Sequence, residues 1–170
     1  MLTPTIQDAL NKQLNAEFAS SYLYLSMAAW LEAQNLSGMA HWMRLQADEE
    51  WEHAMRIFDF VHDRDGRVTL SSIEAPLAEW KSVLDVFEAS LAHERQITQQ
   101  INELVDLALQ EKDHAANAFL QWFVSEQVEE EATVKSIVDK LKLAGDSGVA
   151  LFMLDTELGR RTESPAESSS

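Results

Sequence analysis

The sequence contains no cysteine, which excludes disulfide bonds and thiolate metal ligands. Glycine and proline are also scarce, with five and three residues in a chain of 170, and this scarcity is typical of a mostly helical protein. The first residues, Met1-Leu2-Thr3-Pro4-Thr5, contain neither the basic region nor the apolar run of a signal peptide. Because a cysteine-free chain suits a reducing compartment, we expect a cytoplasmic protein.

Basic residues are few: 13 Lys and Arg stand against 29 Asp and Glu, giving a net charge of −16. Nucleic acid is therefore excluded as a partner, because binding phosphates requires basic patches. No apolar run approaches the roughly 20 residues of a membrane-spanning helix, so we expect no membrane partner either. Cations are the favoured ligands, although most of the acidic residues are expected to form a solvated surface.

Apolar residues recur at alternating steps of three and four, which predicts long amphipathic helices in an all-α bundle. The chain length and a hydrophobic fraction of 46% suit one domain with a sizeable core. Thr3 and Pro4 are typical of a helix start, and Ser37 is expected to cap the second helix. The spacing predicts helices at about 4–34, 38–64, 81–110, 114–143 and 149–158.

The segment 65–80 is expected to be a long connection, because Gly66, Pro76 and a run of polar residues interrupt the helical pattern. At roughly 3.3 Å per residue it covers about 50 Å, whereas a helix over 38–64 is about 40 Å long. The connection can therefore run the length of the bundle, which makes the second and third helices parallel.

The C-terminal part of the chain divides into an apolar segment and a polar tail. Residues 149–158 are too apolar to remain in water and too short to span a membrane. We interpret this segment as a contact with another subunit, in preference to docking on its own bundle. The tail 159–170 has the composition of a disordered segment, and no function is assigned to it.

Residues of metal-ligand type interrupt the apolar face of each of the four long helices near its middle. A single interruption is typical of a hydrogen-bonded core residue, but four at one level predict a metal site. Oxygen ligands with one histidine and no sulfur suit iron or manganese, and clustered carboxylates favour a pair of divalent cations. The interrupting residues, in chain order, are Glu17, Glu50, His53, Glu94, Gln127 and Glu130.

These residues lie in stretches that resemble the bacterial non-haem ferritins over about residues 1–158. The matching stretches are Asn15-Ala16-Glu17 with Tyr24, Glu49-Glu50-x-x-His53, Glu94, and Phe119-Leu120-Gln121-Trp122 followed by Ser125-Glu126-Gln127-x-Glu129-Glu130. The resemblance implies a ferritin-like four-helix bundle with a long crossover and a short fifth helix. It further implies assembly as a hollow cage of twenty-four subunits.

The resemblance also implies an activity, namely oxidation of Fe²⁺ by O₂ at a di-iron ferroxidase centre and storage of the ferric mineral. It assigns Glu17, Glu50 and His53 to the first iron, and Glu50, Glu94 and Glu130 to the second, with Gln127 close by. Glu49, Glu126, Glu129 and Glu130 match a third site, and Tyr24 is expected to act in redox chemistry or hydrogen bonding at the centre. Each assignment is carried by the matched position alone.

Haem is not expected, because Trp51 stands where the second helix of bacterioferritins carries a haem-ligating Met. The fourth helix also lacks the second Glu-x-x-His that bacterioferritins have, with Gln127-x-x-Glu130 in its place. The DNA-protecting miniferritins do not fit either, because they usually lack a fifth helix and often carry a basic arm.

Two other functions remain open, namely a storage subunit without oxidation and a soluble di-iron or di-manganese enzyme acting on peroxide or an organic substrate. Trp122 is read equally well as a packing residue or as an electron donor. The remaining histidines have no partner at ligand spacing and are expected at the surface: His41, His62, His93 and His114.

Overall fold

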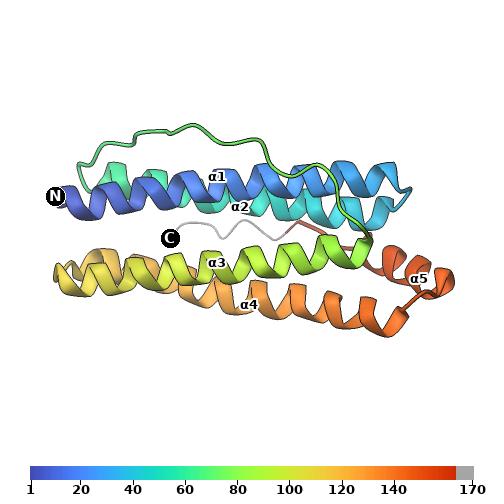
Figure 1. The fold of residues 1–170 in the computed structure, drawn as a ribbon. Helices are drawn as coiled ribbons and strands as arrows, with labels where there is room; N and C mark the ends of the chain where they lie inside the picture. Colours follow the sequence, from blue (N-terminus) through green and yellow to red (C-terminus); the bar gives the residue numbers. More distant parts are fainter. Residues whose placement is uncertain (164–170) are drawn as a thin grey trace.

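The computed structural model describes residues 1–163, and the residues 164–170 of the predicted tail lie outside the described part. The described residues form five helices and no strand (Figure 1). Each helix begins and ends within two residues of its expected position. The helices are α1 (Pro4–Ala33), α2 (Ser37–Asp63), α3 (Val83–Gln110), α4 (His114–Ala144) and α5 (Gly148–Leu158).

Side-chain caps fix the starts of three of the long helices. Thr3 accepts a hydrogen bond from the Ile6 amide at 3.3 Å, with Pro4 as the first residue of α1. Ser82 and Asp113 act in the same way at the starts of α3 and α4. The prediction that Ser37 caps α2 is wrong, because Ser37 is the first helical residue and Leu36, which has no capping side chain, precedes it.

An aspartate of α5 supplies the missing cap of α2. Asp155 accepts a hydrogen bond from the backbone amide of Met39 at 2.8 Å. An amide at a helix start needs an acceptor from outside the helix, and a carboxylate there also interacts favourably with the helix dipole. The start of α2 is therefore completed by residues more than 100 positions away in the sequence.

The long connection follows the whole bundle, so that α2 and α3 run parallel while α1–α2 and α3–α4 form antiparallel pairs (Figure 1). Three polar side chains of α1, each one turn from the next, accept hydrogen bonds from the backbone of the connection. The pairs are Gln7 with Arg67, Asn11 with Thr69, and Asn15 with Ser71. A row of amide side chains on α1 thus holds an extended chain that has no secondary structure of its own.

The apolar core consists of two clusters separated by polar residues near the middle of the bundle. One cluster lies toward the α5 end and includes Met27, Met43 and Phe87. The other lies toward the N-terminal end and includes Leu10 and Ile101. Among residues 1–163, no helix combines the length and the apolarity that a membrane crossing requires.

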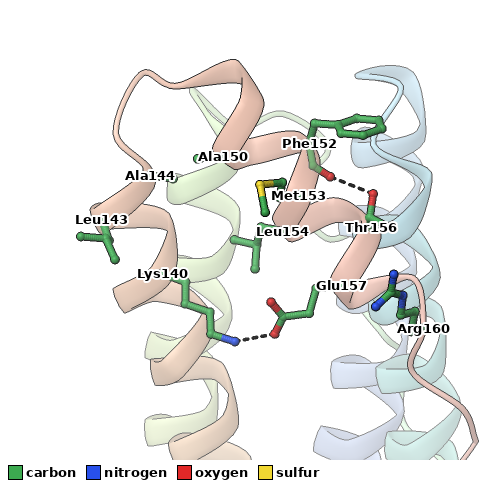
Figure 2. A pocket seen from close by; sticks show the side chains of 10 residues that line it. All are labelled: Lys140, Leu143, Ala144, Ala150, Phe152, Met153, Leu154, Thr156, Glu157 and Arg160. Atoms are coloured by element: carbon green, nitrogen blue, oxygen red, sulfur yellow. Dashed lines mark hydrogen bonds and ion pairs between the residues drawn. The ribbon is translucent and has the colours of Figure 1, made fainter.

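Helix α5 docks on its own bundle, which corrects the preference for a contact with another subunit alone. Leu154 and Leu158 are buried against the bundle, with 6% and 8% of their surface exposed. The opposite face keeps large apolar side chains exposed, including Phe152 and Met153 at 71% and 66%. Figure 2 shows these residues beside a groove between α4 and α5. Contact of this second face with another subunit remains a prediction.

The start of the predicted disordered tail is also ordered by contact with the bundle. Gly159 follows α5 closely against Gly38, and a side-chain carbon built at Gly159 would lie 3.0 Å from the Gly38 Cα. Arg161 contacts α2, and only 21% of its side chain is exposed. The prediction of disorder is therefore wrong for residues 159–163.

The close approach of α5 to α2 predicts a strong effect of Gly38→Ala. A Cβ at residue 38 would lie 1.9 Å from the Asp155 carbonyl oxygen, so α5 must shift and its cap on α2 must weaken. We expect the free energy of unfolding to fall by about 1–3 kcal/mol, measured by urea unfolding followed by circular dichroism. Gly148→Ala is the matched control, because a Cβ there has no atom of residues 1–163 within 4 Å. Equal unfolding midpoints for the two variants would contradict the docking argument.

Candidate metal centre

Six polar side chains from α1, α2, α3 and α4 meet between the two apolar clusters. None exposes more than 6% of its surface, although five of them carry or can carry a charge. All six were expected there from the interrupted apolar faces. We call this set the carboxylate layer, and it consists of Glu17, Glu50, His53, Glu94, Gln127 and Glu130.

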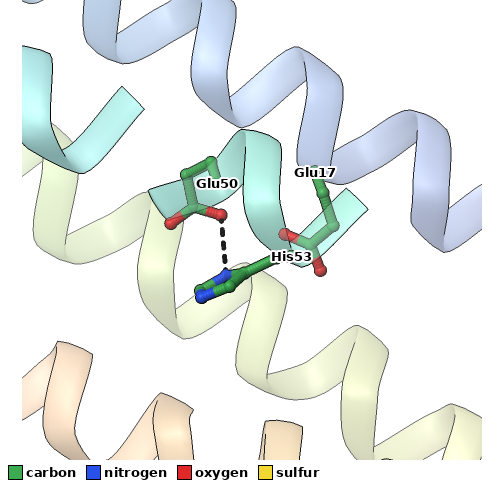
Figure 3. A group of neighbouring side chains, drawn as sticks. All are labelled: Glu17, Glu50 and His53. Carbon is green, nitrogen blue, oxygen red and sulfur yellow. Dashed lines mark ion pairs between the residues drawn. The ribbon is translucent and has the colours of Figure 1, made fainter. Parts of the chain in front are cut away.

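Glu17, Glu50 and His53 form the tightest group of the layer (Figure 3). One ligand atom from each lies within 4.8 Å of the others, and Glu50 Oε2 is 3.4 Å from His53 Nδ1. The Oε2 atom of Glu17 is buried and has no hydrogen-bond partner among the described residues. A buried carboxylate oxygen without a donor is costly, and a cation coordinated by the three side chains would satisfy it.

Glu94 is held from two sides by side chains of α1 and α4. Gln127 donates to Glu94 Oε2 at 3.1 Å and to the Glu94 main-chain oxygen at 3.2 Å. The Tyr24 hydroxyl donates to the other carboxylate oxygen, Oε1. Burial raises the pKa of Tyr24 well above its usual range, with Glu94 and Glu50 adding to the shift, so the phenol keeps its proton.

Gln46 links two carboxylates of the layer, a role that the sequence reasoning missed. Its amide nitrogen lies 2.7 Å from Glu130 Oε2 and 3.5 Å from Glu50 Oε1. Gln13 similarly donates to Glu17 Oε1 at 2.8 Å. Both glutamines lie one helical turn before a glutamate of the layer, so the spacing Gln-x-x-x-Glu on a buried face was the available signal.

The layer holds more carboxylates than the protein can neutralise. In the part of the chain that the structure describes, no Lys or Arg forms an ion pair with Glu17, Glu50, Glu94 or Glu130, and only His53 pairs with one of them. Burial raises the pKa of all four carboxyls, and their mutual repulsion adds to the shift of most of them. For Glu130, burial together with Glu94 and Glu49 raises the pKa to about 8. This donor set fits hard divalent cations, which would replace the protons.

The residues expected at a third site are brought together only in part. Ligand atoms of Glu126, Glu130 and His53 lie within 4.8 Å of one another. Glu49 is half-buried and pairs with Arg161 at 2.5 Å. Glu129 is exposed on α4 and belongs to neither group of potential ligands among the described residues.

Trp122 and His93 are aromatic neighbours of the carboxylate layer, and His93 does not lie where it was expected. Trp122 packs edge-on against the His53 ring, with centroids 5.2 Å apart, and carries the Arg56 guanidinium 3.9 Å from its ring centroid. His93 was expected at the surface, but it is half-buried, 2.7 Å from Ser20 Oγ and edge-on to Tyr24. The expectation failed because the partner of His93 is Ser20 on α1, 73 positions away, and such a contact leaves no local pattern in the sequence.

Comparisons with known proteins place the chain among the ferritins. The Ferritin family, described as a Ferritin-like domain, matches residues 7–144. A bacterial non-heme ferritin of Bacteroides fragilis is 45% identical over 161 residues, covering 95% of this chain and 100% of its own. One from Escherichia coli is 44% identical over 158 residues, covering 93% and 96%. The structure of an open pore ferritin from Archaeoglobus fulgidus aligns with a TM-score of 0.94 at 50% identity, covering 95% and 100%. The predicted fold and resemblance are confirmed.

The raised carboxyl pKa values predict that the metal-free protein loses stability as pH rises. Protons that the folded layer retains and the unfolded chain releases contribute stability that is complete below the unfolded Glu pKa of about 4.3. This contribution disappears as pH rises through the folded value, about 8 for Glu130. The free energy of unfolding should therefore fall from about pH 4.3 to about pH 8 and level off above that.

The variant Glu130→Gln isolates one carboxyl, because an amide of the same shape does not titrate. Its stability should fall less steeply over the same pH range, measured by urea unfolding of the metal-free protein. Glu129→Gln, an exposed position on the same helix, should keep the wild-type slope. Identical slopes for wild type and Glu130→Gln would rule out a retained proton on Glu130.

Proposed function

The chain belongs to the ferritin family, and from this premise we propose that it oxidises Fe²⁺ with O₂ and stores the ferric product. The observation that carries the proposal is the carboxylate layer, in which four buried carboxylates and one histidine converge without a basic partner from Lys or Arg among the described residues. Fe²⁺ supplies the positive charge that the layer requires, and it is the substrate of the reaction rather than a permanent cofactor.

Two Fe²⁺ ions are bound by overlapping sets of ligands. Glu17, Glu50 and His53 bind the first, in agreement with their mutual distances (Figure 3). Glu50 is shared with the second ion, whose other ligands are Glu94 and Glu130, with Gln127 orienting Glu94 through its hydrogen bond. Carboxylate oxygens are hard ligands and stabilise Fe³⁺ more than Fe²⁺, which lowers the free energy of the oxidised state.

The reaction transfers one electron from each of two Fe²⁺ ions to a single O₂ molecule. The chain contributes by holding both ions at fixed positions in a site that excludes bulk water. Tyr24 is assigned a role at the centre, because its hydroxyl donates to a ligand of the second ion and stays protonated. From this position it orients Glu94. In a redox role its electron would pass to the neighbouring iron and its proton to Glu94, the acceptor of its hydrogen bond.

Storage requires a cavity, and we propose that twenty-four copies of the chain assemble into a hollow cage. The exposed apolar face of α5 supports this assembly, since Phe152 and Met153 require a partner surface. Glu49, Glu126, Glu129 and Glu130 are proposed to form a third iron site between the carboxylate layer and the cavity. Fe³⁺ leaves the paired site past these carboxylates. The proposal places this activity in the cytoplasm and involves no haem.

The observed geometry supports the two alternative functions less well than it supports iron oxidation and storage. A storage subunit without oxidation has no need of a buried histidine and four buried carboxylates, which cost stability in the metal-free protein. An enzyme acting on an organic substrate requires access for a large molecule, whereas none of the six layer residues exposes more than 6% of its surface. The burial favours small substrates, namely metal ions and O₂.

Removing the shared ligand is the sharpest test of the paired site. Glu50→Ala should slow the first, fast phase of Fe²⁺ oxidation by about two orders of magnitude or more, because both ions lose a ligand. Oxygen consumption and absorbance after anaerobic loading with two Fe²⁺ per subunit measure the rate. Glu52→Ala, at an exposed position two residues further along the same helix, should leave the rate unchanged. Circular dichroism should show intact helices in both variants, and a wild-type rate in Glu50→Ala would refute the assignment.

The third site predicts a different kinetic signature. Glu126→Ala should spare the first oxidation step, because Glu126 is not a ligand of either ion in the paired site. Later turnover should change, seen as a different iron-to-oxygen ratio or slower oxidation after repeated additions of Fe²⁺. If the kinetics of Fe²⁺ oxidation stay unchanged through every addition, Glu126 is only a solvated surface charge and the third-site assignment is wrong.

A further inference from the structure

The guanidinium of Arg161 lies beside Glu49, one of the carboxylates of the proposed third site. It donates to Glu49 Oε2 at 2.5 Å, to Gln46 Oε1 at 3.0 Å and to the Trp42 carbonyl oxygen at 3.3 Å. It also lies over the Trp42 ring, 4.7 Å from its centroid. His41 Nε2 donates to the Arg161 main-chain oxygen at 2.9 Å, which fixes the backbone as well.

These contacts form an enclosed position on α2 rather than a chance surface pair. The Arg161 and Glu49 side chains are 21% and 17% exposed, and the guanidinium uses both terminal nitrogens. Its neighbour Arg160 is exposed and lines the groove between α4 and α5 (Figure 2). Two adjacent arginines thus have different surroundings, and of the two it is Arg161 that contacts Glu49 and Gln46 beside the carboxylate layer.

Arg161 also determines which end of the Gln46 amide faces the carboxylate layer. A guanidinium carries only donors, so it requires the amide oxygen of Gln46 and leaves the NH₂ group pointing the other way. That NH₂ group faces Glu130 at 2.7 Å and Glu50 at 3.5 Å. A single side chain therefore connects the C-terminal segment to two proposed iron ligands.

A metal ion that binds Glu49 at the third site competes with Arg161, which lies 2.5 Å from Oε2 of the same carboxylate. The two positive charges would repel each other at close range, and the guanidinium holds one of the two carboxylate oxygens that an ion can coordinate. The segment 159–163 can move away from α2 and so release Arg161 from Glu49. It follows the last helix, and it contacts α2 through Arg161 and Gly159.

We propose that Arg161 is an internal competitor for the third-site cation, which holds Glu49 until a metal ion displaces it. The proposal rests on the third site of the proposed function. Displacement also releases the Gln46 amide, so filling the third site loosens the hydrogen bonds on Glu130 and Glu50. A cation at the third site thereby changes the hydrogen bonding of the paired site and also releases the C-terminal segment from α2.

The first test is calorimetric titration of the metal-free assembled protein with Zn²⁺, which binds carboxylates and histidine without redox chemistry. Arg161→Gln removes the competing charge and should tighten binding at the third site on the order of tenfold. Binding of the first two equivalents should be unchanged. Arg161→Lys keeps the charge but loses the forked contact and the stacking on Trp42, so it should give an intermediate affinity.

Arg160→Gln is the matched control, since it removes the same charge from an exposed neighbouring position. Its Zn²⁺ affinities should equal those of the wild type. If Arg160→Gln tightens third-site binding as much as Arg161→Gln does, the effect is one of net charge and the proposal is overturned.

The second test follows the displacement itself. The chain has no cysteine, so Thr162→Cys gives a single attachment point for a nitroxide spin label next to Arg161. The label should be restrained in the metal-free protein and become mobile when Zn²⁺ fills the third site. Adding Glu49→Gln should make the label more mobile before any metal is present.

The outcomes separate this proposal from the proposed function. Unchanged or weaker third-site binding in Arg161→Gln, or a label that stays restrained in the metal-loaded protein, overturns the role of Arg161. Two bound equivalents of Zn²⁺ without a third, in wild type and Arg161→Gln alike, also overturn it while leaving the paired site intact. Failure of the wild type to bind the first two equivalents would refute the proposed function instead.

Discussion

The rest of the structure depends on one constraint, the concentration of four carboxylates in a layer that excludes water. Burial raises the pKa of each, and repulsion between neighbours opposes their ionisation. The apolar clusters on either side supply the stability that this layer costs, and they also keep it dry. A site built in this way is poorly satisfied by protons alone and well satisfied by cations, so the same burial that destabilises the layer gives it affinity for metal.

The sequence predicted those parts of the structure that repeat with helical period. Spacing of three and four placed the layer residues on buried faces, and the length of the 65–80 segment was enough to make α2 and α3 parallel. The roles of residues that act through a single polar contact cannot be predicted from spacing in the same way. Gln46 and Gln13 have the spacing of ordinary core positions, and only the neighbouring carboxylate shows what their amides do.

The errors share one physical cause, which is that contacts between distant segments leave no local pattern. Ser37 is the expected cap because Ser favours that position, yet Asp155 from α5 accepts the hydrogen bond of the Met39 amide. His93 looked like a surface residue because its partner Ser20 lies 73 positions away. The polar composition of 159–163 indicated disorder, and composition carries no information about the carboxylate and the indole that Arg161 meets on α2.

Helix α2 is where these distant contacts meet. Its first turn receives a cap from α5, and its second and third turns contact Arg161 through Trp42 and Gln46. Its middle provides two layer residues, Glu50 and His53. The residues concerned follow one another by steps of three and four, so the contacts of the C-terminal segment and the two layer residues lie along one face of α2. The Gln46 amide joins the two, because its NH₂ group faces Glu130 and Glu50 in the layer and its oxygen accepts from Arg161. The C-terminal segment is therefore part of the surroundings of the metal centre, although it follows the last helix.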